Sequence, residues 1–123
     1  MKRLILLTVL CTTLSACGIN ESKLSFSELQ TIPNDLQMKI DPGSTLQLIN
    51  TKGDTSYVVY HTKKSVDTDF EAQEDTVKIK LDESNDTSKN AQQHVYKLIL
   101  DSEHEIIDVY VNGKSTAFDN VTN

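Results

Sequence analysis

The sequence predicts an α+β fold in which one or two short N-terminal helices precede a mostly antiparallel β meander of six to seven strands. After Gly43, apolar residues recur at every second position and turn-forming residues interrupt them at short intervals, which is typical of a meander. Before Gly43, two short apolar segments instead follow residues that cap helices. We expect the sheet to curl into a small sandwich or a partly open barrel.

The first helix is predicted just after residue 23. Ser25 and Glu28 have the spacing of a capping box, while Leu24 and Leu29 occupy the positions of a hydrophobic staple. Pro33 must end this helix, because proline cannot continue one. The helix should therefore be short.

A second helical turn is predicted between the two prolines. Asn34 and Asp35 can cap it, and Leu36 and Ile40 are four residues apart on one face. The Asp-Pro-Gly sequence at residues 41–43 closes it. We expect these helical turns to cover one face of the sheet.

Two hairpins are predicted next. Residues 45–50 and 55–62 alternate around a Lys-Gly-Asp turn, and the second hairpin occupies residues 65–81. In the second hairpin an acidic strand faces a basic strand, with Asp69 opposite either Lys78 or Lys80. Both registers keep the apolar faces aligned, so the sequence leaves them open.

The remaining chain predicts a loop and two more hairpins. Residues 82–93 have almost no apolar content and predict a long exposed loop, either a recognition element or a plain connector. Residues 94–100 and 105–112 then read as paired strands with apolar side chains on both faces. Asn112-Gly113 is a strong hairpin signal because a type I′ turn needs positive φ at both central residues. It should place Phe118 opposite Ile107.

The first 17 residues have the pattern of an export signal. Lys2 and Arg3 precede an apolar run at residues 4–10, which is too short to span a membrane. Leu-Ser-Ala-Cys at residues 14–17 resembles the lipobox of bacterial lipoproteins, and the chain is similar to small surface lipoproteins of Gram-positive bacteria. The resemblance implies cleavage before Cys17, a diacylglyceryl thioether on that cysteine, and a lipid anchor on the extracytoplasmic face of the cell membrane.

The predicted organisation follows from this resemblance. Residues 1–16 form the signal peptide, residues 17–23 form a lipid-bearing tether, and residues 24–123 form a single α+β domain. Cys11 lies in the discarded segment and Cys17 is consumed by the anchor, so no disulfide or cysteine nucleophile is expected in the domain.

The charge balance of the chain limits the classes of partner that it can bind. The chain has 18 acidic residues against 12 lysines and arginines, for a net charge of −6. This balance argues against nucleic-acid binding, which needs clustered basic residues. We expect a monomer that meets the membrane through the lipid on Cys17 and meets an envelope protein as its partner.

Few residues in the sequence indicate a catalytic or metal-binding role. Asp82, Ser84 and Asp86 offer oxygens at alternate positions but lack the glycine and terminal glutamate of an EF-hand, so they are only weak metal candidates. The three histidines lack a metal spacing and are predicted to face solvent at strand ends or turns. No cofactor, metal or catalytic residue is expected.

The sequence favours a non-catalytic binding or interaction module with an unidentified ligand. One alternative is an inhibitor or immunity-type lipoprotein that acts on one envelope partner. A second is an envelope enzyme or folding factor, which would need polar side chains converging in a concave pocket.

Overall fold

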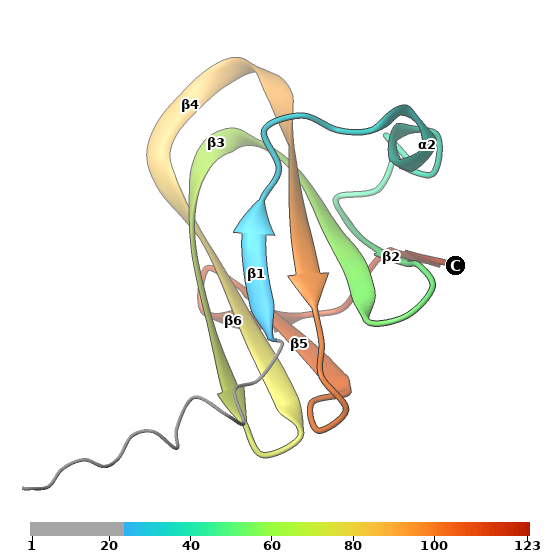
Figure 1. Cartoon of the computed structure of the whole chain (residues 1–123). Coiled ribbons are helices and arrows are strands. Elements are labelled where there is room, and N and C mark those ends of the chain that lie inside the picture. Colours follow the sequence, from blue (N-terminus) through green and yellow to red (C-terminus); the bar gives the residue numbers. More distant parts are fainter. Residues whose placement is uncertain (1–23) are drawn as a thin grey trace, which may run out of the picture.

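A computed structural model describes residues 24–123, which form one curled sheet of seven strands and a single helical turn (Figure 1). The strand order in the sheet is β6-β5-β4-β3-β2-β7, and β1 pairs separately with β4. The elements are β1 (Ser25–Glu28), α2 (Asn34–Gln37), β2 (Leu46–Asn50), β3 (Thr55–Gln73), β4 (Thr76–Ile99), β5 (Ile106–Val111), β6 (Lys114–Thr116) and β7 (Asn120–Thr122).

The fold is built on the long β3–β4 hairpin, which bends in its middle (Figure 1). Its pairing is irregular between Thr62 and Val66, where β4 has more residues than β3. Such bulges bend a strand and increase its twist. The bend divides each strand into halves: residues 55–62 and 66–73 in β3, and residues 76–83 and 92–99 in β4.

The halves acquire different neighbours because of this bend. The first half of β4 pairs in parallel with β5, whereas its second half pairs with β1. The first half of β3 pairs with β2, which in turn pairs in parallel with β7. The sheet is therefore mixed.

The predicted α+β class is wrong. The segment predicted as the first helix is strand β1, antiparallel to β4 from Ser25 opposite Ile99 to Glu28 opposite Tyr96. Leu24 and Phe26 alternate with serines and pack against the core, so burial along a period of two outweighs the local capping signal. Between residues 24 and 123 the only helix is the four-residue turn α2, which is too short to form a layer.

The predicted antiparallel meander is also wrong. Residues 82–93 belong to β4 and carry the chain across the bend instead of forming a loop. Residues 94–99 pair with β3 and β1, not with residues 105–112. The polar composition of residues 82–93 reflects exposure at the bend, since a strand there needs few buried side chains.

Two predicted hairpins are confirmed, and one open register is resolved. β2 and β3 pair around the turn at residues 52–54. Asn112 and Gly113 have φ of 52° and 82° and connect β5 to β6, which ends at Thr116 before reaching Phe118. In the β3–β4 hairpin Asp69 lies opposite Lys80, the second of the two registers.

Apolar residues are buried on both faces of the sheet. The concave face holds the larger core, which includes Leu46, Val58, Ile79, Tyr96 and Leu98. The convex face holds a smaller cluster: Leu36 and Ile40 from the α2 region cover Ile49, Val59 and Val95. The segment before β2 thus covers one face of the sheet, although only one turn of it is helical.

A buried glutamine fastens this covering segment and the C-terminal strand to β2. The Gln47 Oε1 atom accepts a hydrogen bond from the Asp41 backbone N–H at 2.8 Å. Its Nε2 atom donates to the Lys39 carbonyl at 2.9 Å and to the Thr122 hydroxyl at 3.0 Å. A side chain that is only 1% exposed therefore satisfies three groups from two segments.

Candidate functional site

The edges of β1 and of the second half of β3 come together where the Phe26 and Phe70 rings meet, and we call this region the β1–β3 seam. Within residues 24–123, β1 pairs only with β4, and residues 66–73 of β3 also pair only with β4. One edge of each strand is therefore unpaired. Figure 1 shows β1 in front of the sheet, between the second half of β3 and the second half of β4. An unpaired edge offers backbone donors and acceptors to another chain.

Aromatic side chains line the inner side of the seam. The rings of Phe26 on β1 and Phe70 on β3 lie 5.7 Å apart, and Phe26 stacks on Tyr96 at 5.1 Å. Both phenylalanines are only partly buried, as is Val66. Thr68 alternates with Val66 and Phe70 on the same face and is exposed, so solvent reaches the inner face of β3 at this residue.

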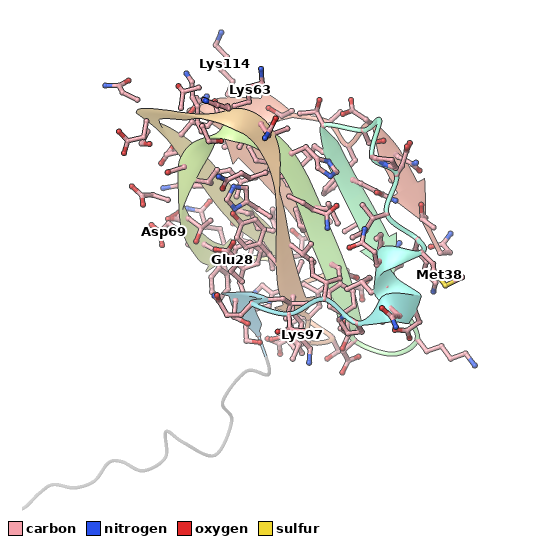
Figure 2. The ribbon with its side chains drawn as sticks, turned by 90° about the horizontal axis from the view of Figure 1, so that it is seen from above. Glu28, Met38, Lys63, Asp69, Lys97 and Lys114 are labelled. Atoms are coloured by element: carbon pink, nitrogen blue, oxygen red, sulfur yellow. The ribbon has the colours of Figure 1, made fainter. Side chains whose placement is uncertain are left out.

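Acidic side chains line the outer side of the seam. Asp67, Asp69 and Glu71 alternate with the inward residues of β3, and Figure 2 shows Asp69 at the periphery of the molecule. Lys80 forms an ion pair with Glu71 at 3.4 Å. Asp67 instead lies directly opposite Asp82, and both are exposed. Like charges directly opposite on a sheet repel.

A polar group lies at the end of the seam, where β1 ends. The Glu28 carboxylate contacts His94 Nδ1 at 3.1 Å, and the His94 ring lies parallel to Tyr96. The His94 Nε2 and Tyr96 hydroxyl atoms are buried without a hydrogen-bond partner among the described residues. Burial raises the pKa of Tyr96, and the nearby Glu28 charge adds to the rise. The tyrosine is therefore a neutral hydroxyl at physiological pH.

A second polar group, which we call the Glu83 cluster, joins both halves of the bent hairpin to the β5–β6 turn. One carboxylate oxygen of Glu83 accepts hydrogen bonds from the hydroxyls of Thr62 and Tyr60, the latter at 2.9 Å. The other accepts from the Asn112 side-chain amide at 2.9 Å, and the Glu83 N–H donates back to Asn112 at 2.8 Å. These contacts fix the curvature of the sheet at its bend.

The chemistry of the Glu83 cluster follows from these contacts. The hydrogen bonds from Thr62 and then Asn112 lower the pKa of Glu83 from its ordinary value of 4.5, because they stabilise the carboxylate. Burial, reinforced by the hydrogen bond to this carboxylate, raises the pKa of Tyr60 to about 12. Glu83 is thus ionised at neutral pH, and Tyr60 keeps its proton and donates a hydrogen bond to it. A structural role explains both.

The residues proposed from the sequence are placed as follows. Cys17, the signal peptide at residues 1–16 and the tether at residues 17–23 lie outside the described residues. Asp82 and Asp86 are exposed on β4, and Asp86 N–H donates to the Ser84 hydroxyl at 3.2 Å. In the part of the chain that the structure describes, no three His, Cys, Asp or Glu side chains are grouped to hold a metal.

The prediction that the histidines face solvent is wrong. His61 contacts the Ser44 carbonyl at 2.8 Å and the Gln93 side chain at 3.1 Å. The side chains of His94 and His104 are only 12% and 15% exposed, and each contacts a carboxylate. Strand-end positions indicate exposure, but the curled sheet and the turn at residues 101–104 partly bury these side chains.

Sequence reasoning missed both the seam and the Glu83 cluster. The sequence predicts a loop at Glu83, and nothing near it in sequence indicates Tyr60 or Asn112 as partners. The alternation of Leu24 and Phe26 with serines in residues 24–28 was the one signal that could have identified β1.

Comparison of the chain with protein families, with curated proteins and with solved structures yields no match. Across residues 24–123 the structure contains no helix long and apolar enough to cross a membrane.

Proposed function

We propose that the chain is a lipid-anchored extracytoplasmic protein whose β domain binds a protein of the cell envelope without catalysing a reaction. The observation that carries the binding role is the β1–β3 seam, where two unpaired strand edges flank partly buried aromatic side chains and acidic side chains. Proteins recognise extended segments by adding a strand to such an edge. The lipobox at residues 14–17 supports the anchor.

The anchor and the seam belong to neighbouring parts of the chain. β1 begins at Ser25, so even a fully extended tether from Cys17 would span at most roughly 30 Å. The seam would therefore stay close to the membrane surface. Two acyl chains on Cys17 hold a protein stably, because each buried CH₂ contributes about 0.8 kcal/mol. The partner is then a membrane protein or another anchored protein.

Cys17→Ser tests the anchor. We expect this variant to lose metabolic labelling by radioactive palmitate, because the thiol that carries the lipid is gone, and to be released or to stay unprocessed. Labelling and membrane fractionation of cells that express the full chain measure both effects. Cys11→Ser is the matched control, since it removes a thiol from the discarded segment, and it should label like the wild type.

Unlabelled wild type that still fractionates with the membrane would contradict the lipid anchor. Equal labelling of Cys17→Ser and the wild type would contradict it as well.

A further inference from the structure

We propose that the β1–β3 seam binds an extended peptide segment whose apolar and basic side chains alternate. This inference rests on the proposed binding function and names its ligand class. It follows from three features of the seam: its backbone edges, its inner face and its outer face.

The backbone of the seam can accept one further strand. β1 and the second half of β3 both pair with β4 and lie in ring contact through Phe26 and Phe70, yet they share no backbone pairing. A strand placed between them would meet an unpaired edge on each side, with neighbours spaced about 4.7–4.9 Å apart as in any sheet. Such a segment would hydrogen bond in both directions, so its main chain supplies affinity for any sequence.

The inner face of the seam selects apolar side chains. Every second residue of an inserted strand would point toward Phe26, Phe70 and Val66, which are partly buried and pack against the main core. Thr68 is exposed between Val66 and Phe70 and leaves this face accessible. Apolar side chains placed there would be favoured because they remove apolar surface from water.

The outer face of the seam selects basic side chains. The intervening residues of the strand would lie beside Asp67, Asp69 and Glu71 on β3 and beside the small Ser27 on β1. Lys80 already neutralises Glu71. The side chains of Asp67 and Asp69 form no hydrogen bond or ion pair within residues 24–123, and Asp67 also lies opposite Asp82.

A lysine or arginine there would remove the repulsion between Asp67 and Asp82 and form ion pairs across neighbouring strands. An acidic segment would add to this repulsion. The seam alternates apolar inner side chains with acidic outer ones. It therefore favours a ligand in which apolar and basic side chains alternate.

The other outer edges of the sheet fit a ligand strand less well. β6 and β7 are each three residues long, whereas the second half of β3 presents residues 66–73. Strand addition gains hydrogen bonds with length, so the longer edge is favoured. β6 also begins with Lys114, which would repel a basic segment.

Peptide binding to the detergent-solubilised full chain tests the proposal. The probe is a short synthetic peptide that alternates valine with lysine, and fluorescence anisotropy measures its affinity. We expect saturable binding by this peptide and none by a peptide of the same length that alternates valine with glutamate. N-methylation of alternate peptide nitrogens should abolish binding, because it removes the donors that pair with an edge strand.

The Asp67→Asn/Asp69→Asn double variant tests whether the peptide binds at the seam. We expect affinity for the valine–lysine peptide to fall roughly two- to thirtyfold, since each exposed ion pair contributes about 0.2–1 kcal/mol. Glu103→Gln/Glu105→Gln is the matched control, because it removes the same charge from exposed residues outside the seam and should leave affinity unchanged. Amide signals of residues 66–73 and 25–28 should shift on binding, whereas those of β7 should not.

Several results would overturn the proposal. They are equal binding of the valine–glutamate peptide, equal loss in the two double variants, shifts confined to β6 or β7, or occupation of the seam by a second copy of this chain. Palmitate labelling of the same preparation separates the hypothesis of the peptide ligand from the hypothesis of the lipid anchor. A labelled protein that ignores the peptide refutes this ligand alone, whereas an unlabelled protein refutes the anchored function.

Discussion

Replacing Leu36 with alanine should lower the free energy of unfolding by about 2–5 kcal/mol. Leu36 is the buried residue of the helical turn α2 and is only 5% exposed. It packs with Ile40 on the convex face of the sheet against Ile49, Val59 and Val95. Truncation would remove apolar contacts and open a cavity between the covering segment and the sheet. Urea unfolding followed by circular dichroism measures the change.

Met38→Ala is the matched control for this prediction, because Met38 follows α2 on the same segment and is 85% exposed. It should change the free energy of unfolding by less than about 0.5 kcal/mol. Similar small effects of both variants would mean that the segment before β2 does not cover the convex face.

Replacing Glu83 with glutamine should destabilise the protein at neutral pH by about 1–3 kcal/mol, after allowance for its partial exposure. The carboxylate accepts hydrogen bonds from Tyr60, Thr62 and Asn112, and these link both halves of the hairpin to the β5–β6 turn. Glutamine replaces one carboxylate oxygen, which accepts hydrogen bonds, with an NH₂ group, which donates them. That NH₂ group would face at least one of the three donor side chains. Unfolding measured across a pH series tests this expectation.

The pH dependence of this effect has a defined direction. The pKa of Glu83 is lowered in the folded protein from the ordinary value of 4.5, so folding stabilises the ionised form. The contribution of Glu83 is therefore fully present above about pH 4.5 and is lost as the pH falls through the lower folded-state pKa. The difference between wild type and Glu83→Gln should shrink over that acidic range.

Glu103→Gln is the control for Glu83→Gln, because Glu103 is exposed in the turn after β4. It should show little destabilisation and no such pH dependence. A constant difference between wild type and Glu83→Gln from neutral to strongly acidic pH would contradict the role of the carboxylate.

The local hairpins could be predicted from the sequence because their signals lie within a few residues of one another. The turn at residues 52–54 and the Asn112-Gly113 turn each depend on a glycine at positive φ. Those glycines can be identified in the sequence without knowledge of the fold. The two candidate registers of the β3–β4 hairpin were likewise visible from its alternating charges, although only the structure selects Asp69 opposite Lys80.

The mixed topology could not be predicted because it depends on long-range pairing. Residues 82–93 have almost no apolar side chains, and their strand conformation comes from the pairing of their neighbours across the bend. Ser25 and Glu28 likewise carry a helix-capping pattern, yet the edge of β4 pairs with them. The candidate site is an outcome of this topology, since the seam exists only because β1 and β3 both pair with β4.

The central claim is that the protein binds its partner through the β1–β3 seam. Its most direct test places a photo-crosslinking amino acid at Thr68 in the seam or at Val121 on β7, in the full chain on intact cells. Both positions are exposed. We predict that Thr68 yields one stoichiometric adduct with an envelope protein, that its yield falls in Asp67→Asn/Asp69→Asn, and that Val121 yields none. The same adduct from Val121 but not from Thr68, or only a dimer of this chain from Thr68, would contradict the claim.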